Sequence, residues 1–238
     1  MGNNINIVDH CSDEKFGSNF RFMALLLAAG ESKRYGKPKQ LVEFYGCPLL
    51  RLSVKKIKNL NPRILKVILG KAAKECVQVI ADLEVEAVIN KDWAQGVGSS
   101  LKLGIDEFLP FFENEMDKQA PLLVSLCDQP LIPSSHYYHL VDSFYKNKGT
   151  DIIATSYLSD GSDCGGVPAV FSRRMLDKIL ASFDEDGEGS VYNNGAKAII
   201  RSESNKLLLS CPQAQFDIDT VSDLQTCERY AALGLDFT

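Results

Sequence analysis

Short runs of apolar residues recur along the chain, and polar residues or glycines follow each of them. Such runs are too short for a buried helix and are typical of strands that are covered on both faces of a sheet. We therefore predict strands at 22–28, 64–70, 85–89, 121–127, 151–155 and 206–210.

Segments with apolar residues three or four positions apart lie between these runs and predict amphipathic helices. In 134–145, for example, Tyr137, Leu140 and Phe144 would share one helical face. The last segment starts with Thr220 and has Asp223 three positions on, which is the pattern of a capping box at a helix N-terminus. The predicted helices are 50–57, 72–83, 99–108, 134–145, 173–183 and 220–233.

The alternation of strands and helices predicts crossovers that place helices on both faces of a mostly parallel sheet. The expected fold is a three-layer α/β/α sandwich with a Rossmann-like sheet. Residues 1–20 show no sustained period, so we predict a flexible extension there and a single domain over 21–238. We also expect an exposed connection at 113–118 and a turn-rich link between strands at 160–166.

Composition excludes several classes of protein. The 238 residues include 26 Lys and Arg against 31 Asp and Glu, a net charge of −5, which disfavours nucleic acid as the main partner. The longest apolar run is 22–29, far short of the roughly 20 residues of a membrane helix, and the polar start lacks the pattern of a signal peptide. The seven scattered cysteines form no C-x-x-C pair, as expected for reduced thiols in a cytoplasmic protein.

The chain has only three histidines, which disfavours both a Ser-His-Asp triad and a histidine-based metal site. His136 and His139 are three positions apart in a predicted helix, and we expect both on the helix surface. Cys127 and Trp93 are expected to fill the core. A nucleophilic role for Cys127 would need a base, which the sequence does not provide.

The loop after the first apolar run is the strongest candidate for a ligand site, because ligands of parallel sheets lie at the carboxyl ends of the strands. Gly30 would let backbone N–H groups approach an anion. Arg34, Lys37 and Lys39 add positive charge within six positions, which suits a triphosphate, whereas the alternative is a solvated basic turn. The spacing from Gly30 to Gly36 fits neither a dinucleotide fingerprint nor a P-loop.

Two carboxylates also follow predicted strands. Asp128 ends an apolar run, where an ionised carboxylate needs a partner such as a divalent cation, and a helix cap is the alternative role. Asp219 offers a second carboxylate, with Asp217 as a competitor two positions away. Because Mg²⁺ keeps several waters and takes few protein ligands, two carboxylates would suffice to bridge it to a triphosphate.

Two further segments contain glycine next to polar residues or proline. Gly98, Ser99 and Ser100 precede a predicted helix. One serine could be only the N-cap of that helix, but the nearby glycines suit a flat ligand packed on the backbone. Gly166 and Pro168 lie in a segment that could be only a turn before an edge strand.

Five of these segments follow one another in an order and spacing that match a known group of enzymes. They are Leu27-Ala-Ala-Gly30 with Ser32, Arg34, Gly36 and Pro38-Lys39-Gln40-Leu41; Asn90, Trp93, Gly96 and Gly98-Ser-Ser-Leu101; Cys127-Asp128-Gln129-Pro130-Leu131; Gly166-Val-Pro168-Ala-Val-Phe171; and Asp217-Ile-Asp219-Thr220 with Asp223-Leu224. Over about residues 22–232 the chain resembles the nucleotidyltransferases with a nucleotide-diphospho-sugar-transferase-like fold, and within them the molybdenum cofactor cytidylyltransferase branch.

The resemblance implies roles for individual residues. Arg34 and Lys39 would be catalytic and stabilise charge around the α-phosphate. Asp128 would bind Mg²⁺ together with Asp219. The implied binding residues are Leu27, Ala28, Ala29, Gly30, Ser32, Gln40, Gly98, Ser99 and Ser100 for the nucleotide, and Gly166 and Pro168 for the acceptor.

The resemblance also implies the reaction, namely transfer of the nucleoside monophosphate of CTP onto molybdopterin with release of pyrophosphate. Ala29 favours the cytidylyl branch, since the guanylyl branch has Gly at this position. A molybdoenzyme or its chaperone would be the protein partner. The family's Gly-Asp-x-Gly loop is replaced by Asp186-Gly-Glu-Gly189, which bears on the second substrate. The alternatives are a nucleotidyltransferase acting on a sugar or polyol phosphate, and a non-catalytic nucleotide-binding protein.

Overall fold

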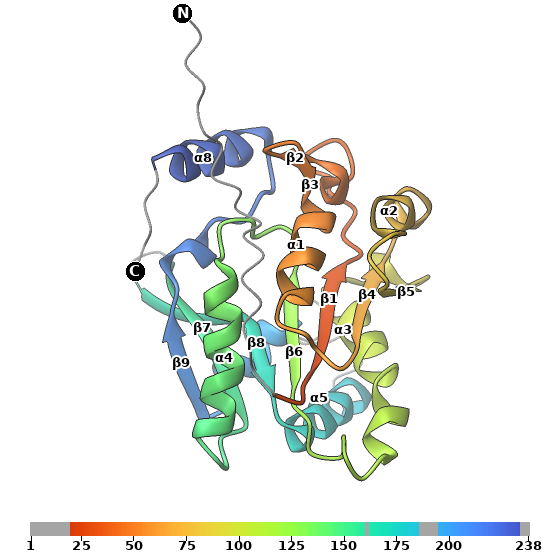
Figure 1. Cartoon of the computed structure of the whole chain (residues 1–238), viewed down its shortest axis with the longest axis vertical. Helices are drawn as coiled ribbons and strands as arrows, with labels where there is room; N and C mark the ends of the chain where they lie inside the picture. The colour runs from red at the N-terminus through yellow and green to blue at the C-terminus, as the bar shows by residue number, and fades with distance from the viewer. Residues whose placement is uncertain (1–19, 160–161, 186–194, 234–238) are drawn as a thin grey trace, which may run out of the picture.

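The computed structural model describes residues 20–159, 162–185 and 195–233, and a seven-stranded sheet runs through this part of the chain (Figure 1). From edge to edge the strands are β5 (Glu86–Ile89), β4 (Leu65–Leu69), β1 (Met23–Ala28), β6 (Leu122–Leu126), β8 (Ser162–Phe171), β7 (Ile152–Ser159) and β9 (Lys206–Ser210). Only β8 runs antiparallel to its neighbours in this sheet. The predicted mostly parallel sheet is confirmed.

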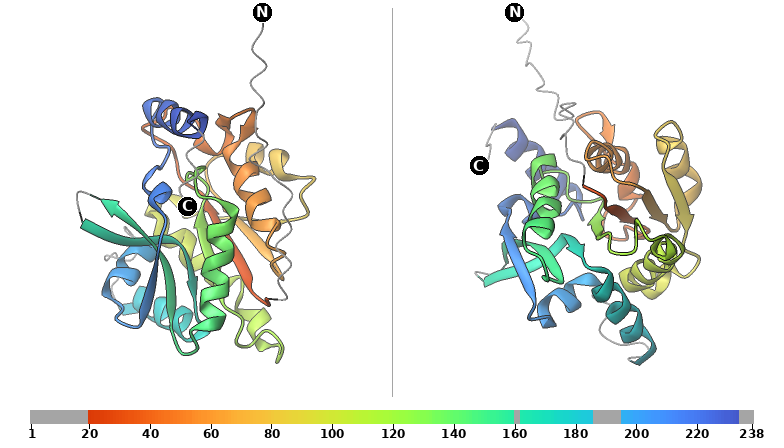
Figure 2. Two further views of the ribbon diagram at one scale, coloured as in Figure 1. Left: turned by 60° about the vertical axis from the view of Figure 1, so that its left-hand side comes forward. Right: turned by 60° about the horizontal axis from the view of Figure 1, so that its bottom comes forward.

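Helices cover both faces of the sheet, as the alternation predicts (Figure 2). One face packs against α1 (Leu49–Lys58), α2 (Ala73–Ile80) and α4 (Ser134–Lys146). The other packs against α3 (Val97–Asp106), α5 (Arg173–Glu185) and α7 (Ala196–Ser202). The three-layer α/β/α sandwich is therefore confirmed, although α7 was not predicted.

The carboxyl edge of the parallel strands carries a small additional layer, seen at the top of Figure 1. It contains α8 (Val221–Ala232) and the paired strands β2 (Glu43–Phe44) and β3 (Cys47–Pro48), which share a third apolar cluster. The short 3-10 helices are η1 (Lys39–Leu41), η2 (Trp93–Gln95), η3 (Leu109–Glu113) and η4 (Pro212–Gln215).

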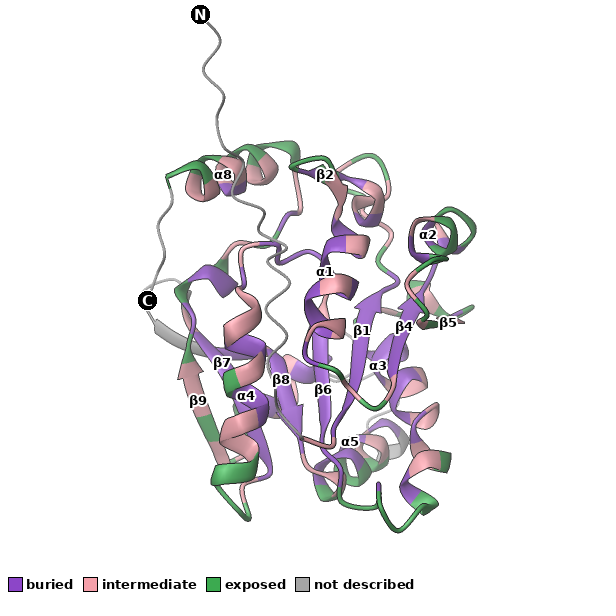
Figure 3. Cartoon of the chain, viewed as in Figure 1, coloured by how far each residue is buried: buried purple, intermediate pink, exposed green. Residues whose placement is uncertain are grey.

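β1 shows why its run is apolar throughout. Ala24 and Leu26 belong to the core under α1, α2 and α4, whereas Met23 and Leu25 belong to the core under α3, α5 and α7. All the residues of β1 are buried (Figure 3). The chain therefore leaves the core only after Ala29, and Gly30 is the first exposed residue, which places the following loop at the carboxyl edge.

The segment with Gly166 and Pro168 corrects our prediction. It lies in the interior strand β8, not in a turn before an edge strand, and much of 160–166 also belongs to β8. A Cβ on Gly165 would come within 2.8 Å of Ile200 Cγ2, and one on Gly166 within 2.9 Å of the Tyr157 hydroxyl. The glycines thus allow neighbours to pack closely on this strand.

The histidine prediction is wrong for one of the two residues. His136 is buried in α4, and its Nε2 lies 2.9 Å from Thr155 Oγ1. His139 is exposed, as predicted. The predicted exposed connection at 113–118 is exposed apart from the buried Asp117.

Helix caps agree with the sequence at one helix and not at another. Thr220 and Asp223 form the predicted capping box of α8. The N-cap of α3 is Gly96, not Ser99 or Ser100.

Cysteines whose side chains are described form no disulfide. Within the described ranges, no helix is both long and apolar enough to cross a membrane. The predicted extension at 1–20 lies outside the described residues, apart from residue 20.

Candidate functional site

The loop after β1 is held in place by Gln40. Its buried side-chain amide donates hydrogen bonds of 2.8 Å to the carbonyls of Ala28 and Gly30. The Ser32 hydroxyl accepts a hydrogen bond of 3.0 Å from the main-chain N–H of Lys39. A Cβ on Gly30 would meet no atom within 4 Å, so the loop borders open space. The predicted nucleotide-binding residue Gln40 thus uses its amide inside the loop.

Lys39 joins this loop to the two predicted metal-binding carboxylates. Its Nζ lies 2.5 Å from Asp128 Oδ2 and 3.0 Å from Asp219 Oδ1. The side chains of Lys39 and Asp128 are each 13% exposed. Burial alone would lower the pKa of Lys39, but the charge and hydrogen bond of Asp128 raise it above its ordinary value. Lys39 is therefore a fixed positive charge.

Arg34 approaches the same cluster from the solvent side. Its Nη2 lies 2.7 Å from Asp219 Oδ2, and its side chain is 71% exposed. Burial opposes ionisation of Asp219, but the hydrogen bond and charge of Lys39 and the charge of Arg34 lower the pKa of this carboxyl overall. The structure thus brings Arg34, Lys39, Asp128 and Asp219 together at the carboxyl edge.

Two segments far apart in sequence position the carboxylates. Asp128 follows β6, and its carbonyl accepts a hydrogen bond of 2.9 Å from the main-chain N–H of Ile218. Asp219 directly precedes the N-cap of α8, where Asp223 Oδ2 accepts from the N–H groups of Asp219 and Thr220 at 3.0 and 2.7 Å. The capping box therefore also orients Asp219.

The carboxylates fit a divalent cation. Asp128 Oδ1 is buried and accepts no hydrogen bond from the described part of the protein. Carboxylate oxygens are the ligands that hard cations prefer. Over the described residues, no group of three or more His, Cys, Asp or Glu side chains is placed to hold a metal ion. A cation that takes one or two carboxylates and completes its coordination with water and phosphate matches this donor set.

Asp217 differs from Asp219 in its electrostatics. Solvent reaches the residue, yet the protein around its carboxyl and the repulsion of Asp128 raise its pKa to about 7. The ion pairs of Arg34 and Lys39 go to Asp219 instead. The ion pairs with the two cations therefore place Asp219, rather than Asp217, in the charged cluster.

Asn90 organises the second glycine-containing loop. This residue is 3% exposed, and its Nδ2 donates to Ser99 Oγ and Ser100 Oγ at 3.0 and 2.9 Å. Ser99 Oγ in turn donates to the carbonyls of Asp92 and Gly96. Both serines are buried and shape the loop. No individual role is predicted for Asn90 from the sequence, although its place directly after a predicted strand is a usable signal.

The predicted acceptor residues lie inside the sheet. Gly166 and Pro168 are both buried in β8. The Pro168 carbonyl accepts a hydrogen bond of 2.5 Å from Thr155 Oγ1, and Gly166 packs against Tyr157. Their contacts are thus with β7 rather than with the Arg34 and Lys39 side chains.

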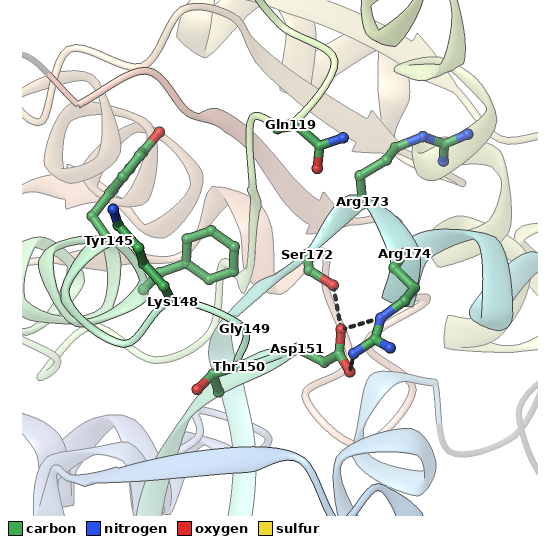
Figure 4. Close-up of a pocket in the computed structure, with 10 residues that line it drawn as sticks. Gln119, Tyr145, Lys148, Gly149, Thr150, Asp151, Ser172, Arg173 and Arg174 are labelled. Carbon is green, nitrogen blue, oxygen red and sulfur yellow. Dashed lines mark hydrogen bonds and ion pairs between the residues drawn. The ribbon is translucent and has the colours of Figure 1, made fainter.

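A cavity of about 480 Å³ lies at the opposite edge of the sheet (Figure 4). Its lining includes residues at the amino end of β7 and just after β8. The end of β8 pairs with the start of β6, so the cavity lies at the amino ends of the parallel strands. There the Asp151 carboxylate accepts from Ser172 and forms an ion pair with Arg174. None of the predicted site residues lines this cavity.

Comparisons with known proteins agree with this fold. The model of the MobA-like NTP transferase domain matches residues 24–206. No curated protein matches the chain significantly in sequence.

Solved structures share the fold at low sequence identity. Rv0371C of Mycobacterium tuberculosis, in complex with manganese, has a TM-score of 0.66 and 21% identity over 88% of this chain and 98% of that chain. Molybdopterin-guanine dinucleotide biosynthesis protein A of Archaeoglobus fulgidus has a TM-score of 0.64 and 14% identity over 89% of this chain and 100% of that chain. The 4-diphosphocytidyl-2C-methyl-D-erythritol synthase of Anaerococcus prevotii has a TM-score of 0.68 and 11% identity over 89% of this chain and 96% of that chain.

Proposed function

Because the chain belongs to the family of MobA-like NTP transferase domains and is a nucleotidyltransferase, we propose that it transfers the cytidylyl group of CTP onto the phosphate of molybdopterin. The acceptor oxygen attacks the α-phosphorus, the bond from the α-phosphorus to the bridging oxygen breaks, and pyrophosphate leaves. The attacking oxygen is already anionic, so no general base is needed. The observation that carries the proposal is the convergence of Arg34 and Lys39, both from the loop after β1, with Asp128 and Asp219.

Each cationic side chain has a distinct place in this scheme. Lys39 is largely shielded from solvent, tied to the loop and charged, so it offers a preorganised contact for phosphate oxygens. Arg34 is exposed and can form paired hydrogen bonds with a phosphate group. Asp128 and Asp219 would hold a divalent cation, expected to be Mg²⁺, which when bound would neutralise charge on the triphosphate. The manganese in the Mycobacterium structure supports a divalent ion.

The choice of substrates rests on two observations. Ala29 follows the pattern of the cytidylyl branch, which supports CTP. The Archaeoglobus neighbour is named for molybdopterin-guanine dinucleotide, which supports a molybdopterin acceptor but not the choice of CTP. A molybdoenzyme or its chaperone would then receive the product.

The test is pyrophosphate release with CTP, GTP, ATP or UTP in the presence of Mg²⁺ and molybdopterin. We expect turnover with CTP, and we expect Asp128→Ala to abolish it while the variant still unfolds cooperatively. No turnover with any nucleotide and acceptor would refute the proposed reaction. Full activity of Asp128→Ala would refute the assignment of the site.

A second candidate acceptor is a sugar or polyol phosphate. The changed sequence at 186–189, which lies outside the described residues, favours it, as does the fold shared with the erythritol synthase of Anaerococcus. Sugar and polyol phosphates should be assayed beside molybdopterin with both CTP and UTP. Turnover with molybdopterin alone would eliminate this alternative.

A further inference from the structure

The segment that carries Asp128 is held from one side by helix α1. Ser53 and Lys56 are three positions apart and therefore share a helical face. The Ser53 hydroxyl donates to the Leu49 carbonyl of its own helix at 3.0 Å and also lies 3.3 Å from the carbonyl of Cys127, the residue directly before Asp128. Lys56 Nζ donates to the carbonyl of Pro130 at 2.5 Å and to that of Ile132 at 2.8 Å. These contacts bracket Asp128 on both sides along the chain.

Lys56 is an unusual residue to bury for stability alone. It is only 7% exposed, and an ammonium group loses much of its hydration at such a position. An apolar side chain of similar length would fill the same space without that loss, as replacements of buried ion pairs by apolar residues show. What Lys56 adds is a fixed direction for two carbonyls of the Asp128 segment.

The opposite side of the segment is tied to the chain that leads to the second carboxylate. The main-chain N–H of Ile218 donates to the Asp128 carbonyl at 2.9 Å, one residue before Asp219. Gln129 Nε2 donates to the carbonyl of Ala214 at 3.1 Å. With its backbone held on both sides, Asp128 can keep Oδ1 directed into a site where no described group donates to it.

We propose that Lys56, assisted by Ser53, is a positioning residue that fixes Asp128 for binding the divalent cation. This inference rests on the proposed function, since it assigns the cation to Asp128. Lys56 contacts neither nucleotide nor acceptor in this scheme. It acts through the backbone of the 127–132 segment.

The test replaces Lys56 with Met, and Lys58→Met is the matched control. Lys58 lies in the same helix and also donates to a main-chain carbonyl, that of Leu83, but on another segment. The probe is Mn²⁺, titrated by electron paramagnetic resonance with and without CTP. We expect Lys56→Met to weaken Mn²⁺ binding about 10- to 100-fold, the usual effect of losing a group that orients a metal ligand. Lys58→Met should bind Mn²⁺ like the wild type.

A merely structural role for Lys56 would lower the free energy of unfolding without a selective loss of Mn²⁺ affinity. A folded Lys56→Met with wild-type Mn²⁺ affinity therefore overturns the inference. If Lys56→Met does not fold, Ser53→Ala replaces it, because it removes a single hydroxyl next to the Cys127 carbonyl of the same segment. Ser53→Ala should also weaken Mn²⁺ binding, and unchanged affinity there overturns the inference as well.

The assay separates this inference from the proposed function. A wild type that binds Mn²⁺ through Asp128 but releases no pyrophosphate contradicts the reaction and leaves the positioning role standing. If the wild type turns over CTP but Lys56→Met binds Mn²⁺ with normal affinity, the positioning role is contradicted and the proposed reaction stands. Absence of Mn²⁺ binding to the wild type, with or without CTP, overturns the positioning role.

Discussion

Lys39 is the residue on which the electrostatics of the cluster depend most, because its ammonium contacts both Asp128 and Asp219. Lys39→Met keeps the length of the side chain and removes its charge. We expect the rate of pyrophosphate release at saturating CTP and Mg²⁺ to fall about 10²–10³-fold, the range for loss of one preorganised stabilising contact.

The control for this prediction is Lys37→Met in the same loop. Lys37 is exposed and lies over the Tyr35 ring, with Nζ 5.9 Å from the ring centroid. Its replacement should leave the rate within a few fold of the wild type, since it contacts neither carboxylate. Equal rates for the two variants would remove Lys39 from the catalytic machinery.

His136 should make stability depend on pH. The Thr155 hydroxyl gives its proton to the Pro168 carbonyl, so it accepts a hydrogen bond from His136 Nε2. Burial, with a smaller effect from the charge of His139, lowers the pKa of His136 to about 4. As pH falls below about 6.5 the unfolded chain binds the proton first, so stability is full above that pH and declines towards pH 4.

The expected loss from this histidine is about 2 kcal/mol between pH 7.5 and pH 5, within the window set by the two pKa values. Urea unfolding at the two pH values measures it. His136→Gln retains a hydrogen-bond donor and does not titrate. Over this window the variant should therefore lose less stability than the wild type, and the difference should equal the loss assigned to His136. If the variant and the wild type lose stability equally, another group is responsible.

The sequence identifies the charged residues of the site but not their pairing. Glycine, basic residues and carboxylates at strand ends predict a phosphate and cation site. In the ligand-free protein these groups instead neutralise one another, because buried charges without partners are costly. Lys39 is 89 positions from Asp128 and 180 from Asp219, so only the packed fold brings them within hydrogen-bond distance.

At the level of elements, predictability follows from how well local pattern and tertiary position agree. β1 is apolar throughout, β4 is apolar apart from Lys66, both are buried along their whole length, and both were predicted. β8 contains Gly165, Gly166 and Pro168, which disfavour a strand, and it forms because β6 and β7 flank it. α7 is short, which leaves little room for a helical period to show.

Gly70 at the end of β4 provides a test of how tightly the strand ends are packed. A Cβ there would lie 2.2 Å from the carbonyl oxygen of Ala29, in the loop after β1. A backbone atom cannot move aside as a side chain can. Gly70→Ala should therefore destabilise the protein by about 1–3 kcal/mol and displace the loop after β1. The readouts are urea unfolding and the KM for CTP.

The matched variant is Gly104→Ala in α3, where the Cβ would meet the Leu25 side chain at 2.5 Å. Alanine gains roughly 1 kcal/mol over glycine inside a helix, which offsets part of the overpacking. This variant should therefore lose less stability and keep the wild-type KM for CTP. A normal KM in Gly70→Ala would show that the loop does not depend on this contact.

The molecule as a whole gathers its chemistry at one edge because six of the seven strands run in the same direction. Gly30, Asn90 and Asp128 each follow a strand of this parallel set. The alternation of elements was enough to predict that arrangement. The covering of this edge by α8, which positions Asp219, depends on packing between distant segments and was not predicted.

Nucleotide binding at this edge should stabilise the whole fold, since only the folded chain assembles the site. A ligand at 100 times its Kd adds roughly 2.7 kcal/mol. In a domain of this size that corresponds to a rise in Tm of about 5–10 °C. In a panel of CTP, GTP, ATP and UTP with Mg²⁺, CTP should give the largest rise, and Asp128→Asn should remove most of the Mg²⁺-dependent part. A larger rise with GTP would exclude the cytidylyl assignment but keep nucleotidyl transfer, whereas no rise with any nucleotide would contradict binding at the Lys39 cluster.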